Sequence, residues 1–169
     1  REFFYTAGND REKIIFWSRI PFILLGVLLG VYVFLFAKEM YNENAGLFAL
    51  FLYTLCPLVL AYIPLAITDG AFAAFFFITV YYFWKWRKEQ KTKYLVLTGL
   101  FLGFANATKF TGVYLIPIFG LLLLMEWYAK KEQAKNIGKD IGYSLVVMCI
   151  ALLIVAASYF FVHFPLYLE

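Results

Sequence analysis

Long uncharged stretches alternate with short clusters of charged residues along this chain. The uncharged stretches are residues 20–37, 44–68, 70–84, 94–108, 110–125 and 141–168. The apolar core of a bilayer is ~30 Å thick and needs about 20 helical residues, so each stretch is a candidate crossing. The pattern predicts an all-α fold, a polytopic transmembrane helical bundle with about six crossings. We expect these crossings at residues 20–38, 45–67, 70–87, 94–108, 110–128 and 141–163.

The segment before the first crossing mixes aromatic and charged side chains. We interpret residues 1–19 as the end of an extracytoplasmic loop with an interfacial segment, and residues 20–168 as the transmembrane helical domain. Pro21 is then expected in the first turn of a helix, where its missing N–H is harmless. Because the chain begins with Arg1 and ends directly after an apolar run, we interpret it as an excerpt of a longer protein.

Two local signals divide the second and third stretches. Pro57 and Pro64 interrupt the second stretch, and interior prolines kink a helix because they remove a backbone hydrogen bond. Asp69 and Gly70 follow, and the Asp-Gly pair is typical of a turn. We therefore expect a broken second crossing and a reversal of the chain at Asp69-Gly70.

The two stretches on either side of Lys109 pose a choice between one helix and two. A single helix would leave this lysine near the bilayer centre, at a cost of roughly 2.5–3.5 kcal/mol. It would also be too long for one crossing. We therefore predict a tight hairpin that turns near residues 106–112.

Composition excludes an ordinary soluble domain and a nucleic-acid binder. The chain is 64% hydrophobic and 15% charged, whereas soluble domains are about half apolar and a quarter charged. Its net charge of +4 comes from basic residues that flank the apolar stretches, so we expect no nucleic-acid partner. Lys and Arg gather on one side, which the positive-inside rule makes cytoplasmic. Arg19, Asp69, Lys109 and His163 then lie on the outer side.

Asp69 and Lys109 each have two interpretations. Asp69 is either an N-cap of the following helix or a carboxylate that lines an extracytoplasmic cavity. Lys109 either offsets the dipole at a helix end or presents a point charge to a phosphate. Arg19 is an interfacial anchor in the plainer interpretation. Glu126, at the opposite end of the bundle, is expected to be solvated.

Four segments together resemble a known family. They are Ser18-Arg19-Ile20-Pro21 with Gly26, NAGLFALFLYTLCPLVL (residues 44–60), PLAITDGAFAAFFF (residues 64–77) and TGLFLGFANATKFTGVYLIP (residues 98–117). In order and spacing the chain resembles the protein O-mannosyltransferase-like glycosyltransferases. These include dolichyl-phosphate-mannose-protein mannosyltransferases and aminoarabinose transferases of lipid A, and they have the membrane-embedded C-type glycosyltransferase fold.

The resemblance implies a function and its partners. Such enzymes transfer a sugar from a polyprenyl- or dolichyl-phosphate carrier to a protein, lipid or glycan acceptor on the extracytoplasmic face. We therefore expect a multi-pass protein of the plasma membrane or the endoplasmic reticulum. The one cofactor that the resemblance suggests is a divalent metal ion.

The resemblance also assigns roles to three residues. Asp69 matches the family's second acidic residue, which would orient a divalent ion or the donor phosphate. Lys109 matches a Thr-Lys lysine that faces the carrier phosphate, and Arg19 matches an arginine at the outer end of a helix. The family's main acidic residue lies in a loop that we expect upstream of Arg1, so the full-length protein would be required for activity.

Two other functions fit the same residues. A polytopic membrane transporter or channel module also has broken helices and charges at membrane depth. A structural subunit of a larger membrane complex would use Asp69 and Lys109 for assembly rather than turnover.

Overall fold

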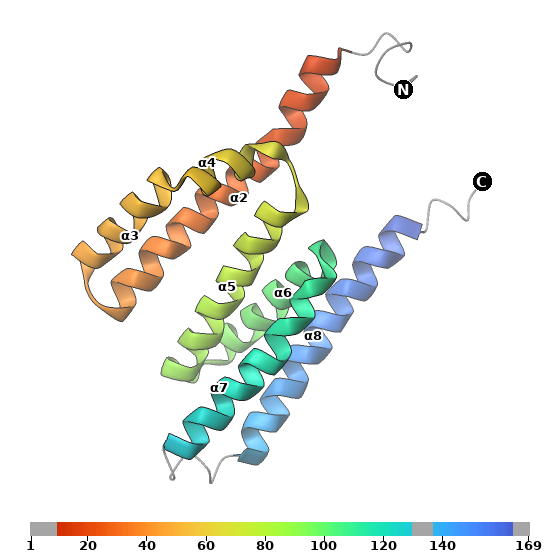
Figure 1. Cartoon of the computed structure of the whole chain (residues 1–169). Helices are drawn as coiled ribbons and strands as arrows, with labels where there is room; N and C mark the ends of the chain where they lie inside the picture. The colour runs from red at the N-terminus through yellow and green to blue at the C-terminus, as the bar shows by residue number, and fades with distance from the viewer. Residues whose placement is uncertain (1–9, 130–136, 164–169) are drawn as a thin grey trace. The chain divides into compact units, whose positions relative to one another are not determined.

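The protein is helical throughout the part that the structure describes. A computed structural model describes residues 10–129 and 137–163 (Figure 1). Its α-helices are α2 (Arg11–Met40), α3 (Glu43–Leu55), α4 (Pro57–Tyr62), α5 (Thr68–Glu89), α6 (Thr92–Thr108), α7 (Leu115–Ala129) and α8 (Ile137–His163). Two short 3₁₀ helices, η1 (Ile63–Leu65) and η2 (Phe110–Tyr114), join them. The expected all-α membrane fold is confirmed.

Fewer helices than expected meet the length and hydropathy of a membrane span. Among the described residues, three do so by themselves: Glu12–Met40, Phe110–Tyr128 and Gly138–Phe160. A fourth is the pair Glu43–Leu55 and Pro57–Leu65, which is bent by 52°. Helix α6 has only 17 residues and α5 carries basic residues in its last turn. About six crossings, and their bounds, therefore stay a prediction.

The chain divides into two compact units, Arg1–Ala74 and Phe75–Glu169. In the first unit α2 packs along α3, which leads through α4 and η1 to the start of α5 (Figure 1). The α2–α3 turn is held by Asn42, whose side chain accepts a hydrogen bond from the Ala45 N–H at 2.9 Å. Lys38 and Glu43 form an ion pair across the same turn at 2.6 Å.

Helix α2 begins earlier than the charge pattern indicates. Asp10 caps it by accepting a hydrogen bond from the Lys13 N–H, and Glu12 lies in its first turn. The helix therefore starts in the mixed polar segment, and Pro21 lies inside it. The expectation that Pro21 occupies the first turn was wrong, because the capping carboxylate of Asp10 extends the helix toward the N-terminus.

The expected break at Pro57 is confirmed, but the reversal lies elsewhere than expected. Helix α3 ends before Cys56, whose backbone is extended, and Pro57 begins α4. The chain then turns at Ala66, which has a left-handed conformation with φ 54°. Asp69 lies in the first turn of α5. The Asp-Gly pair is therefore helical rather than a turn, because Ala66 has already redirected the chain.

The second unit has a continuous apolar core. Its buried residues are Phe83, Trp86, Tyr94, Leu95, Leu102, Leu115, Phe119, Leu123, Val147 and Ala151. Phe83 of α5 and Phe119 of α7 stack with ring centroids 4.1 Å apart. Gly99 and Gly103 let α6 approach α8 closely, since an added Cβ at Gly103 would lie 2.6 Å from Ile154 Cβ. Helix α6 ends at Thr108, so the predicted break beside Lys109 is confirmed.

Candidate functional site

Asp69 lines a small cavity in the first unit. Its place in the first turn of α5 puts the carboxylate beside the free N–H groups of the helix, where negative charge is stabilised. The cavity has a volume of about 260 Å³ and is lined by Leu29, Leu58, Val59, Tyr62, Ile63, Asp69, Gly70 and Ala73. Asp69 supplies the charge in this mostly apolar lining. Such a carboxylate can accept hydrogen bonds from hydroxyl groups or bind a cation.

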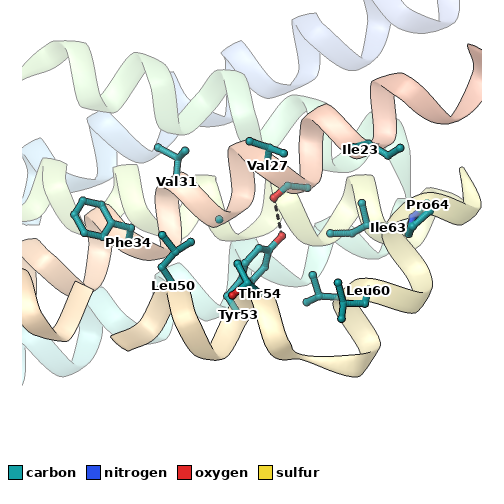
Figure 2. Close-up of a pocket in the computed structure, with 13 residues that line it drawn as sticks. Ile23, Val27, Val31, Phe34, Leu50, Tyr53, Thr54, Leu60, Ile63 and Pro64 are labelled. Atoms are coloured by element: carbon teal, nitrogen blue, oxygen red, sulfur yellow. Dashed lines mark hydrogen bonds between the residues drawn. The ribbon is translucent and has the colours of Figure 1, made fainter. Parts of the chain in front are cut away.

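A larger apolar groove lies next to this cavity. It has a volume of about 560 Å³, and Val59 and Ile63 belong to the walls of both. Its lining residues, labelled in Figure 2, come from α2 (Ile23, Val27 and Val31 among them) and from α3, α4 and η1. The lining of the groove is almost wholly hydrocarbon, which suits an apolar chain better than a polar ligand.

One hydrogen bond holds the two sides of the groove together. The Tyr53 hydroxyl of α3 donates to the Gly26 carbonyl of α2 at 2.7 Å (Figure 2). Small residues of α2 allow this approach, since a Cβ at Gly30 would lie 3.0 Å from the Tyr53 ring and one at Gly26 2.6 Å from Ile63. The spacing of Gly26 and Gly30 therefore sets the width of the groove.

Lys109 lies at the break between α6 and η2 in the second unit. It is exposed, and its extended backbone ends α6 while its N–H still donates to the Ala105 carbonyl at 3.0 Å. The Asn106 side chain donates to the Leu102 carbonyl at 2.9 Å, and a Cβ at Gly112 would lie 3.0 Å from Asn106. The turn is compact and presents the lysine at a helix end, as predicted.

Arg19 is exposed on α2. It is not among the described residues that line the cavity or the groove. The predicted residues therefore fall into separate places: Asp69 in the cavity of the first unit, Arg19 elsewhere on that unit, and Lys109 in the second unit. Their roles stay predictions.

A metal site is not complete around Asp69 within the described part of the chain. No group of three or more His, Cys, Asp or Glu residues gathers there or elsewhere in that part. Magnesium is often held by one or two carboxylates together with substrate phosphates. Asp69 could therefore supply the carboxylate of such a site, and the substrate would have to supply the phosphate. A divalent cofactor stays a prediction.

A buried ion-pair network in the second unit was missed by the sequence interpretation. Arg87 donates from Nε to Glu126 Oε2 and from a terminal nitrogen to Asp140 Oδ1, both at 2.8 Å. Trp127 Nε1 donates to the other Asp140 oxygen at 2.9 Å. The side chain of Glu126 is only 24% exposed, so the expectation that it is solvated was wrong. The network joins α5, α7 and α8.

One comparison with known proteins identifies a family. The sequence profile of the dolichyl-phosphate-mannose-protein mannosyltransferases matches residues 8–162. This range includes Arg19, Asp69 and Lys109. A search of curated proteins and a search of solved structures give no significant match.

Proposed function

Since the chain belongs to the dolichyl-phosphate-mannose-protein mannosyltransferase family, we propose that it moves a sugar from a polyprenyl- or dolichyl-phosphate carrier to a protein, lipid or glycan. The family is one of membrane glycosyltransferases that use lipid-phosphate sugar donors. The extracytoplasmic face, the acceptor and the roles of individual residues are our proposal. The observation that carries it is the cavity with the Asp69 carboxylate beside the apolar groove of the first unit.

The two neighbouring spaces match the two parts of such a donor. A polyprenyl chain is hydrocarbon, and the groove between α2 and the α3–α4–η1 segment is lined by hydrocarbon. A sugar phosphate is polar, and the adjoining cavity has the Asp69 carboxylate in its wall. We place the chain of the carrier in the groove and its sugar at the cavity.

Asp69 then acts on hydroxyl groups rather than on the phosphate itself. A carboxylate repels a phosphate, but it accepts hydrogen bonds from sugar hydroxyls and from an acceptor hydroxyl that loses its proton. Its place at the helix N-terminus favours the ionised form that both roles require. We derive no step through a metal, since the described residues do not complete a metal site.

The leaving carrier phosphate needs a positive partner. Negative charge develops on it as the sugar departs, and a fixed cation stabilises that charge more in the transition state than in the ground state. Lys109 is our candidate, because it is exposed at the turn between α6 and η2. Arg19, exposed on α2, is a second candidate.

The test of the function is Asp69→Asn in the full-length protein. The amide keeps the shape but accepts protons poorly, so we expect transfer to fall about a hundredfold. Asp10→Asn is the matched control, because it changes an exposed aspartate at the start of another helix. The measurements are transfer of labelled sugar and the amount of protein in the membrane. An unchanged rate for Asp69→Asn would remove this residue from the mechanism.

The groove is tested by a matched pair of tryptophans on α2. Val27 lines the groove and is 62% exposed, whereas Leu24 is 63% exposed and lies outside its lining. Val27→Trp should raise KM for the lipid-linked donor about tenfold by filling the groove, with little change in kcat. Leu24→Trp should leave both constants unchanged. Equal effects of the two substitutions would show that the groove does not receive the carrier.

Binding of the bare carrier tests Lys109. Polyprenyl phosphate should bind the full-length protein saturably, and Lys109→Ala should weaken that binding about tenfold by removing a charged hydrogen-bond donor. Binding of polyprenyl phosphate to Arg19→Ala is measured in the same way. The variant with the weaker binding identifies the cation that contacts the phosphate. Unaltered binding by both variants would assign the carrier phosphate to another group.

A further inference from the structure

Two lysines of the second unit share one aromatic ring. The Lys85 ammonium lies 5.3 Å from the centre of the Tyr94 ring, and the Lys93 ammonium lies 4.7 Å from the same centre. Lys85 also donates a hydrogen bond to the Tyr81 hydroxyl at 3.1 Å. The ring attracts each ammonium, but the two positive charges repel each other. An anion placed between the two ammonium groups would reduce that repulsion.

The surrounding charges leave this place positive. Glu89 forms an ion pair of 2.6 Å with Lys91, and that hydrogen bond is the largest cause that lowers the pKa of Glu89. Lys85 and Lys93 lower the same pKa further through their charges, so one carboxylate lies among three lysines. Arg87 is held by Glu126 and Asp140 and leaves both carboxylates engaged.

Lys85 and Lys88 lie at the level of the helix where a membrane surface is expected. The ion pairs of Arg87 bring the end of α5 to Glu126 and Asp140. Glu126 lies near the end of the candidate span Phe110–Tyr128, and Asp140 lies near the start of the candidate span Gly138–Phe160. The lysines beside Arg87 are therefore level with the ends of two spans, where lipid headgroups lie.

An indole supports the same placement. Trp84 lies in the last part of α5, and the exposed Lys88 places its ammonium 4.8 Å from the centre of the indole ring. Tryptophan prefers the headgroup region, where one edge of the ring is apolar and the other is hydrated. With Lys85 and Lys88 it gives this end of the unit a basic and aromatic surface, beneath which the rings of Tyr81 and Tyr94 are buried.

We propose that Lys85 and Lys93 form a binding site for the phosphate of an anionic phospholipid headgroup at the α5–α6 turn. The surface consists of the exposed Lys88 and Lys93 with the half-buried Lys85 and Trp84, and it covers the buried rings of Tyr81 and Tyr94. The phosphate accepts hydrogen bonds from the two ammonium groups beside Tyr94, and Lys88 widens the positive field toward neighbouring headgroups. This site lies at the other end of α5 from Asp69, so it does not depend on the proposed transfer reaction.

The test compares lipid binding by two double variants with the same charge. Lys85→Gln with Lys93→Gln removes the proposed site, whereas Lys13→Gln with Lys38→Gln removes two exposed lysines of the first unit. Phosphatidylglycerol binding to the detergent-solubilised protein is measured by native mass spectrometry, with phosphatidylcholine as the neutral lipid. At about 1 kcal/mol for each lysine, the first variant should bind phosphatidylglycerol about thirtyfold more weakly. The second should bind it as the wild type does.

Three further results decide the proposal. Lys85→Arg with Lys93→Arg should keep binding within a few-fold, because the two charges remain. Equal affinity for phosphatidylcholine, or equal loss in both double variants, would overturn the site. Competition by inorganic phosphate as strong as that of the lipid would also overturn it, because the ligand would then be a soluble anion. Thermal unfolding of each variant shows that it is folded under the conditions of the binding measurement.

Discussion

The two units of this chain differ in where their side chains are buried. In the second unit most of the buried apolar residues form one cluster that draws on α5, α6, α7 and α8. In the first unit the buried hydrophobic side chains among the described residues are Ala71 and Ala74, both on α5. The first unit instead has the groove and the cavity. A packed region holds its shape, and an open region has room for a ligand, so we assign structural support chiefly to the second unit and the hydrocarbon chain of the donor to the first.

The largest expected effect is the loss of the Arg87 network. Arg87→Gln would leave the carboxylates of Glu126 and Asp140 without their cation in a place where the Asp140 side chain is only 6% exposed. Breaking a buried pair from one side costs about 3–5 kcal/mol. The midpoint of thermal unfolding in detergent should fall accordingly, whereas Lys38→Gln should shift it little.

The same variant can break the comparison between the units. If Arg87→Gln unfolds no more easily than the wild type, the second unit is not the more tightly packed of the two. A double-mutant cycle with Asp140→Asn separates the pair from its surroundings. A coupling energy near zero would show that the network is an incidental contact.

Glycines of the second unit give the next largest effect. At Gly103 a Cβ would meet Ile154 Cβ at 2.6 Å and the Ala151 carbonyl at 3.1 Å, and neither can move aside easily. Gly103→Ala should therefore destabilise the protein by about 1–3 kcal/mol, as overpacking does. At Gly120 of α7 a Cβ meets nothing within 4 Å. Gly120→Ala should be neutral or stabilising, because alanine favours the helix. Chemical unfolding of both variants side by side checks the contrast.

The sequence predicted those parts of the fold that depend on neighbouring residues. Long uncharged stretches indicated helices, and Pro57 marked the break after α3 because it lacks a backbone N–H. The predicted position of the reversal was wrong because Ala66 turns the chain in a left-handed conformation. Alanine rarely adopts this conformation, so its presence in the sequence does not indicate a turn. A Gly or Asn at that position would have been a recognisable signal.

The candidate site could be predicted only in part, for a related reason. Asp69 and Lys109 could be predicted as candidates because charged residues between apolar stretches often have a function. The groove depends on how far α2 lies from α3, and the partners of Arg87 are 39 and 53 residues away along the chain. The α2–α3 separation and the partners of Arg87 depend on tertiary packing, which the local sequence pattern does not predict. The family match confirmed a glycosyltransferase family. The roles of Asp69, Lys109 and Arg19 stay predictions, which the variants described above test.

Within the first unit, the hydrogen bond across the groove should have a smaller effect. Tyr53→Phe removes the hydroxyl that donates to the Gly26 carbonyl at 2.7 Å. We expect a loss of about 1 kcal/mol of stability and a larger KM for the lipid-linked donor, because the groove is no longer held at one width. Ser158→Ala is the control, since the Ser158 hydroxyl donates to the Val155 carbonyl of its own helix and Ser158 is not among the residues that line the groove. A change in stability without a change in KM would separate the bond from donor binding.

The smallest effect concerns the turn between α2 and α3, and it appears as a dependence on pH. The hydrogen bond from Lys38, and then its charge, lower the pKa of Glu43 below its ordinary value of 4.5. A lowered folded-state pKa means that the pair stabilises the protein above the unfolded-state pKa, and that this stabilisation is lost as the pH falls through the folded-state value. In NMR titrations of the labelled carboxyl, Lys38→Gln should move the Glu43 midpoint up toward 4.5. Lys13→Gln, which removes an ion pair with Asp10 instead, should leave that midpoint in place. An identical midpoint in wild type and Lys38→Gln would show that the ion pair does not form in solution, and the α2–α3 turn would then depend on the Asn42 cap alone.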